Sequence, residues 1–177
     1  IGQVARAAGW CYMIQWSSRS AEERALLNPS FSSILLWQAA VGCVAETGQG
    51  LALSTAFLVL PFILHRKTRE SLPKSVATSL PVWLEDNKVI RARLPERISL
   101  LVPYTKEALL FSGMRGAITF NQDSILGELG WKAKMNTILA GTSDEVQSCS
   151  KKAYFIGRWL SRAGSPTTLL MLMGVRP

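Results

Sequence analysis

The chain of 177 residues is long enough to bury a sizeable core as one domain, or as one domain with an appended terminal element. Its 48% hydrophobic and 18% charged residues exclude an intrinsically disordered chain, and with six tryptophans they favour surface that a partner covers. The net charge of +8 favours an anionic partner, because a positive field concentrates phosphate groups near the surface.

The first helix with clear boundaries is predicted over residues 29–47, after an N-terminal extension of residues 1–27. Asn28 can cap its first turn, and Pro29 suits the first helical position. Gly48 then supplies a stop signal.

Residues 54–66 are apolar on nearly every side, which predicts a central, buried helix that Pro61 either kinks or restarts. The longest unbroken apolar stretch, 56–64, is much shorter than the roughly 20 residues that a membrane span needs. His65, the only histidine, is expected at the C-terminal end of this helix, where a protonated imidazole interacts favourably with the helix dipole. A structural or capping role is therefore favoured over catalysis.

Two more helices are predicted in the middle of the chain. One begins at Pro73 and runs to about residue 87. The next begins at Pro95, and its apolar period continues across Pro103, which is expected to kink or divide it. Glycines 113 and 116 then end this helix.

A short β-hairpin is predicted near residues 116–129. Ile118 and Phe120 alternate with small or polar residues, residues 121–124 have turn chemistry, and an apolar pair follows. A run of helices followed by a hairpin is the order of a winged-helix domain, in which the hairpin is the wing. The expected fold is therefore mainly α and winged-helix-like, the alternative being an isolated hairpin on a helical bundle.

The C-terminal part is predicted to be helical again, with a strong amphipathic helix over residues 144–163 that Ser143 caps, and a last short helix from Pro166. The predicted organisation is a domain over residues 28–140, with residues 141–177 packing on it. On the polar side of the long helix, three cations form a basic ridge available to an acidic partner: Lys151, Arg158 and Arg162.

Motifs for chemistry are missing from the sequence. It contains no phosphate-binding glycine loop and no His/Cys spacing for a metal, so no cofactor is expected, and its carboxylate pairs are adjacent and point apart on a helix. Three separated cysteines, Cys11, Cys43 and Cys149, favour a reducing compartment. No secretory signal is visible, and the start at Ile1 is consistent with further residues upstream. These observations predict a non-enzyme.

Several longer motifs occur in a recognisable order from Asn28 onward. They are NPSF, ETGQGL, LPFILHRKTRESLP, TSLPVWL, PYTKEALLF, YFIGRWLSRAG and the terminal LMGVRP. In these motifs the chain resembles the middle-component family of bacterial three-component ABC ATPase systems, whereas residues 1–27 contribute nothing to the resemblance.

The resemblance implies a cytoplasmic accessory subunit between an SMC- or Rad50-like ABC ATPase and a separate effector subunit such as a nuclease, in anti-phage or anti-plasmid defence. It also implies a fold like that of the winged-helix accessory subunits of the MukE or KITE kind. A stand-alone winged-helix regulator is the alternative, with Lys106 and Arg115 beside the hairpin touching DNA phosphates.

Eight cations are candidate contacts for a partner or for DNA. For Arg69 a structural role, paired with Glu85 or Asp86, is an equal alternative. The eight are Arg66, Lys67, Arg69, Lys106, Arg115, Lys151, Arg158 and Arg162.

Overall fold

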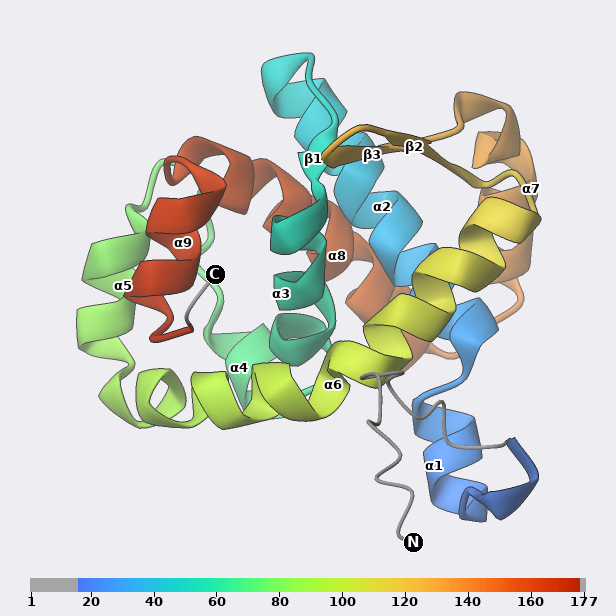
Figure 1. Cartoon of the computed structure of the whole chain (residues 1–177), viewed down its shortest axis with the longest axis horizontal. Helices are drawn as coiled ribbons and strands as arrows, with labels where there is room; N and C mark the ends of the chain where they lie inside the picture. Colours follow the sequence, from blue (N-terminus) through green and yellow to red (C-terminus); the bar gives the residue numbers. More distant parts are fainter. Residues whose placement is uncertain (1–15, 176–177) are drawn as a thin grey trace, which may run out of the picture.

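Helix α2 (Pro29–Thr47) runs through the middle of the molecule in the computed structural model, which describes residues 16–175. Three other helices pack against it: α3 (Leu53–Ile63), α6 (Lys88–Met114) and α8 (Asp144–Arg162) (Figure 1). A small sheet lies across one end of α2, and the shorter helices complete the outside (Figure 1).

The predicted start and stop signals set the bounds of α2. The side chain of Asn28 accepts a hydrogen bond from the Ser30 N–H at 2.8 Å, and Gly48 ends the helix in the left-handed conformation with φ of 70°. Between these caps the helix is buried on most sides, with Leu35 and Leu36 fully enclosed. The prediction for residues 29–47 is confirmed.

Glycines let the backbones of α2 and α8 approach closely. A Cβ atom on Gly157 of α8 would lie 1.9 Å from the carbonyl oxygen of Ala39. A Cβ atom on Gly42 of α2 would lie 2.2 Å from the carbonyl oxygen of Tyr154. Because non-bonded heavy atoms do not approach to such distances, this helix crossing requires glycine on both sides.

The predicted central helix is buried as expected, but it is shorter than predicted. Helix α3 contains Pro61 in its interior and ends at Ile63, and a separate helix, α4 (Arg66–Ser71), follows. The new helix has its own capping residue, His65, which is why residues 64–66 do not continue α3.

The two helices predicted in the middle of the chain begin elsewhere. Helix α5 (Leu80–Asp86) begins seven residues after Pro73, with Pro81 in its first turn, where the missing N–H costs no helical hydrogen bond. The Thr78 carbonyl just before this helix accepts from the indole N–H of Trp159 at 2.6 Å. The indole of Trp83 likewise donates to the Ser71 carbonyl at 2.7 Å. The start of α5 therefore agrees with a local signal at Pro81 and with these tertiary bonds.

Helix α6 begins at Lys88 rather than at Pro95, and it stays one helix through both of its prolines. Leu94 and Ile98 flank the first proline and are 0% and 3% exposed, so their burial holds the helix together there. Figure 1 shows α6 running along one edge of the molecule and then turning toward the sheet, as helices with internal prolines do.

The sheet has three antiparallel strands in the order β1-β3-β2. The predicted hairpin is confirmed as β2 (Ile118–Asn121) and β3 (Ser124–Gly127), with Phe120 opposite Ile125. The two-residue strand β1 (Leu51–Ala52), between α2 and α3, was not predicted, and Leu51 pairs with Ile125. A strand of two residues is too short to show an alternating pattern.

The remaining elements frame this core. Helices α8 and α9 (Pro166–Leu172) confirm the predicted C-terminal helices, and the Ser143 hydroxyl accepts the Val146 N–H. Arg19 joins the N-terminal part to α6 through an ion pair with Glu107 at 2.7 Å. Besides β1 and α4, the elements not predicted are η1 (Trp16–Ser18), α1 (Ala21–Leu26), η2 (Leu129–Trp131) and α7 (Lys132–Ala140).

We expect Gly157→Ala to lower the free energy of unfolding by about 3 kcal/mol, because the added methyl group overlaps the Ala39 carbonyl and forces α2 and α8 apart. Gly130→Ala is the matched control, since nothing lies within 4 Å of the added atom there. Chemical denaturation measures both changes, and equal stabilities of the two variants would contradict a tight α2–α8 crossing.

Candidate functional site

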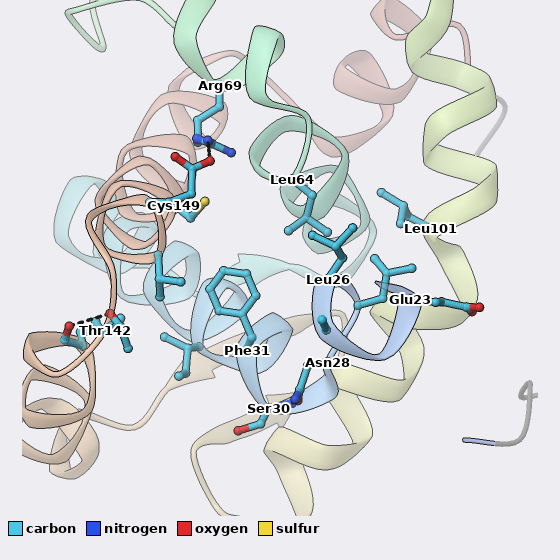
Figure 2. A pocket seen from close by; sticks show the side chains of 16 residues that line it. Glu23, Leu26, Asn28, Ser30, Phe31, Leu64, Arg69, Leu101, Thr142 and Cys149 are labelled. Carbon is cyan, nitrogen blue, oxygen red and sulfur yellow. Dashed lines mark hydrogen bonds and ion pairs between the residues drawn. The ribbon is translucent and has the colours of Figure 1, made fainter. Parts of the chain in front are cut away.

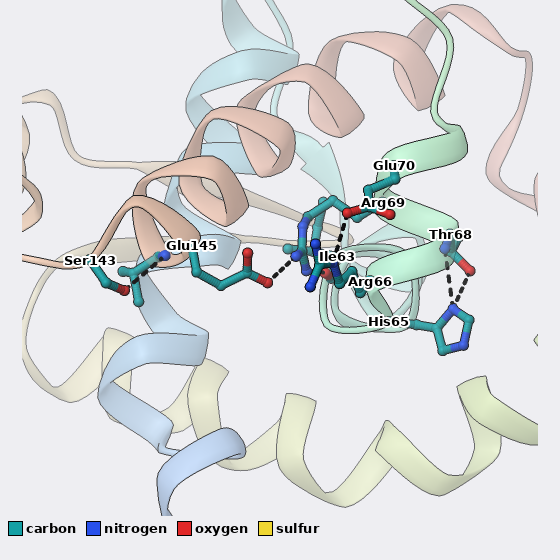
Figure 3. Close-up of polar contacts among 9 residues, drawn as sticks. Ile63, His65, Arg66, Thr68, Arg69, Glu70, Ser143 and Glu145 are labelled. Atoms are coloured by element: carbon teal, nitrogen blue, oxygen red, sulfur yellow. Dashed lines mark hydrogen bonds and ion pairs between the residues drawn. The ribbon is translucent and has the colours of Figure 1, made fainter.

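The turn between α3 and α4 is built around His65. Its Nδ1 accepts a hydrogen bond from the Thr68 N–H at 3.2 Å and lies 2.8 Å from the Thr68 hydroxyl (Figure 3). His65 therefore caps the start of α4, and the expected place at a helix C-terminus is wrong. Burial, and then the nearby cations Arg97, Lys67 and Arg93, lower the pKa of His65, which favours the neutral, accepting imidazole.

Arg69 is only 4% exposed, and its guanidinium holds two parts of the fold together. It donates to the carbonyl of Ile63 at 2.6 Å and forms an ion pair with Glu145 in the first turn of α8 (Figure 3). The partner anticipated for Arg69 was wrong, since Glu85 pairs instead with Arg91 at 2.7 Å. Arg69 thus joins the end of α3 to the beginning of α8.

The other two cations of this segment, Arg66 and Lys67 at the start of α4, lie on the surface. Arg66 forms an exposed ion pair with Glu70 one helical turn later, with 2.7 Å between Nε and Oε1. Lys67 is exposed and has no ion pair within the part of the chain that the structure describes. Among the cations of this segment, Lys67 alone is exposed without an ion pair to a described residue.

An apolar cavity of about 700 Å³ lies beside this turn. Figure 2 shows Leu26, Phe31, Leu64 and Leu101 converging on it from α1, α2, the end of α3 and α6. Burial raises the pKa of the Cys149 thiol in its wall, so this cysteine stays protonated and is a poor nucleophile. Because these four side chains are apolar and the thiol is neutral, the cavity is suited to hold apolar groups.

Two of the three cations in the basic ridge on α8 form ion pairs with a carboxylate of the same chain. Glu46, near the end of α2, forms ion pairs of 2.7 Å with both Arg158 and Arg162. Hydrogen bonds from Arg162 and Arg158 lower the pKa of Glu46, which keeps the carboxylate ionised. Lys151 is exposed and has no ion pair among the described residues.

The two candidate cations near the hairpin project from opposite sides of α6. Lys106 and Arg115 are nine residues apart, which on a helix amounts to a rotation of about 180°. The structure therefore does not bring them together, although both are exposed.

An apolar surface accompanies Lys106. Leu110 and Met114 follow it at helical spacing and are 56% and 88% exposed. Phe120 of β2 lies over α6 at Gly113 and is 47% exposed. We refer to Leu110, Met114 and Phe120 as the apolar surface.

Arg115 lies at a separate feature on the other side of α6. Its guanidinium is 5.3 Å from the centre of the Phe111 ring, and Lys134 Nζ on α7 is 4.4 Å from that of Trp131. These four residues line a hollow of about 260 Å³ together with Ser112. We refer to it as the cationic hollow.

Some classes of site are missing from residues 16–175. No group of three or more His, Cys, Asp or Glu side chains is placed to hold a metal ion there. No helix in the same range is long and apolar enough to pass through a bilayer.

Residues 16–177 match the family model of the ABC-three component (ABC-3C) system Middle Component 3. The chain belongs to this family. The match confirms the resemblance and extends it upstream of Asn28, to include η1 and α1. No curated protein and no solved structure gives a significant match to this middle component.

Sequence reasoning missed the acidic partners of the middle component's arginines. Glu145 pairs with Arg69, 76 residues away, and no spacing in the sequence links the two. Glu46 lies inside the ETGQGL motif, but no spacing links it to an arginine 112 residues later. Lys134 was also missed, because the sequence offers no helix signal around it as clear as those elsewhere.

We expect Glu145→Gln to lower the free energy of unfolding by about 1–2 kcal/mol, because it leaves the buried Arg69 guanidinium without its carboxylate. The expected loss of stability is small because the Glu145 side chain is 60% exposed and water screens its charge. Asp144→Asn is the control, since it removes an exposed charge from the same helical turn without breaking an ion pair. Equal losses measured by denaturation would mean that only the helix dipole is involved.

We expect the stability of the protein to fall as the pH drops below about 6.5, the ordinary pKa of histidine. The pKa of His65 is lowered in the folded state, so its contribution is complete above 6.5 and is lost as the pH falls through the folded-state pKa. His65→Asn keeps a capping acceptor but cannot titrate. Superimposable pH profiles of unfolding for the wild type and this variant would disprove the role of His65.

Proposed function

We propose that this ABC-3C middle component is a non-catalytic, cytoplasmic accessory subunit in bacterial anti-phage or anti-plasmid defence. In this role it bridges an SMC- or Rad50-like ABC ATPase and an effector subunit. Family membership supports a place among the components of an ABC-3C system. The chemistry would then belong to the other subunits, in keeping with the lack of a phosphate-binding loop in this sequence.

The observation that carries the proposal is the apolar surface at the end of α6. Exposed side chains as large as Leu110, Met114 and Phe120, gathered at one place, are typical of a surface that a partner covers. Lys106 beside them adds a charge at the rim, where charges guide association. We assign this surface to the ABC ATPase, and the exposed cations Lys67 and Lys151 to the effector.

A winged-helix fold is part of the proposal. The chain passes through α2, β1 and α3, then through further helices that end with α6, and finally through the hairpin β2–β3. The early strand β1 pairs with β3, the second strand of the hairpin, which is the strand order of winged-helix domains. The hairpin would then correspond to the wing.

A stand-alone DNA-binding regulator is the second candidate function. The cationic hollow favours it, since Arg115 and Lys134 lie close to the hairpin and carry charge suited to phosphates. Such a regulator should be a stable dimer that binds duplex DNA by itself with steep salt dependence.

We expect a tagged copy of the chain, purified from its native cell, to bring a large ABC ATPase with it. Leu110→Gln combined with Met114→Gln should lower ATPase recovery about tenfold or more, because it makes the apolar surface polar. Val89→Gln with Leu100→Gln is the matched control on the same helix, at sites that are 77% and 65% exposed. Mass spectrometry and immunoblotting measure the recovery.

Recovery of a stable DNA-binding homodimer without an ATPase would overturn the accessory role. Equal ATPase recovery for both pairs of variants would instead remove the apolar surface as its site.

A further inference from the structure

We propose that the cationic hollow binds the phosphate backbone of duplex DNA, with Arg115 and Lys134 as its charged contacts. The inference rests on the winged-helix arrangement proposed above and adds to it a defined site. It concerns the face of α6 that carries Arg115, whereas the apolar surface assigned to the ATPase follows Lys106 on the other side.

Both cations are held in place without being neutralised. Arg115 lies over Phe111 and Lys134 over Trp131, at 5.3 and 4.4 Å from the ring centres. Neither forms an ion pair with a carboxylate among the described residues. A cation on an aromatic face is restrained in position and keeps its full charge and its N–H donors for a ligand. Arg158 and Arg162, by contrast, share Glu46.

The same geometry selects the part of the nucleic acid that is contacted. Because the cations cover faces of Phe111 and Trp131, the rings do not offer the open platforms on which single-stranded bases stack. The groups left available are a guanidinium fork and an ammonium group, which suit phosphate oxygens. Contacts of this kind position a protein on a duplex without reading its sequence.

A buried hydroxyl provides a second observation. Ser112 is 1% exposed and lines the hollow, and its Oγ has no hydrogen-bond partner among the described residues. An unsatisfied buried hydroxyl is costly, and most such groups in native proteins have a partner. The hollow therefore has, beside its two cations, a hydroxyl without a partner in the described part of the chain.

The hairpin favours DNA over an acidic peptide as the occupant. Strand β2 begins three residues after Arg115, so the hollow lies where α6 passes into the hairpin. The hairpin turn consists of Gln122 and Asp123, and both are exposed, as is Asn121 at the end of β2. A helix followed by a polar-tipped hairpin can straddle a DNA backbone, and the net charge of +8 would steer the duplex toward it.

The test measures binding of the full chain to a short, fluorescently labelled duplex by anisotropy over a range of salt concentrations. We expect Arg115→Gln with Lys134→Gln to weaken binding and to reduce the slope of log K against log salt by about 1.8, because two phosphate contacts are lost. Lys74→Gln with Lys88→Gln is the control, since it removes the same charge from exposed residues elsewhere. It should leave the slope unchanged.

Three results would overturn the proposal. The first two are an unchanged salt slope for the Arg115/Lys134 variant and an equal reduction of the slope for the control variant. The third is that polyglutamate displaces the labelled duplex as effectively, per negative charge, as unlabelled DNA does. The last would identify an acidic protein as the ligand. The exposed substitutions should leave the unfolding midpoint unchanged. They should also leave ATPase recovery unchanged, so failure of the DNA site and failure of the accessory role are separate results.

Discussion

The close approach of α2 and α8 at Gly42 and Gly157 is the constraint on which the rest of the structure depends. With the two backbones in contact, Trp159 lies one half-turn past the crossing and reaches the aromatic cluster of the core. Its ring centre is 5.5 Å from that of Trp83 and 6.4 Å from that of Phe62. A wider crossing would move these rings apart and break the hydrogen bond from Trp159 to the Thr78 carbonyl.

The position of α8 also decides what the candidate arginines do. Near its start, Glu145 forms an ion pair with Arg69 of α4. Near its end, Arg158 and Arg162 meet Glu46 from α2. The basic residues most prominent in the family motifs thus link α2, α3, α4 and α8, and the buried Arg69 has the contacts of a residue that stabilises the fold. The exposed neighbour Lys67 remains a proposed contact.

Local signals predicted the helices whose caps are local. Asn28, Gly48 and Ser143 act on residues next to them, and their helices begin or end where expected. Prediction failed at α5, which begins beside Pro81 rather than at Pro73 and whose preceding Thr78 carbonyl bonds an indole 81 residues away. The same limit applies to the site: exposed cations can be read from a sequence, but whether Glu46 or Glu145 neutralises them depends on how α8 packs.

Helix α6 then explains how one small subunit could hold two partners. Lys106 and Arg115 both follow Pro103, so the uninterrupted last turns of α6 and its C-cap carry them to the hairpin. Their spacing places the apolar surface and the cationic hollow on different sides of that element. A protein covering Met114 and Phe120 would therefore leave Arg115 and Lys134 free for phosphates. Because no proline lies between these residues, the last turns of α6 fix the orientation of one surface relative to the other, and binding at one would define the position of the other.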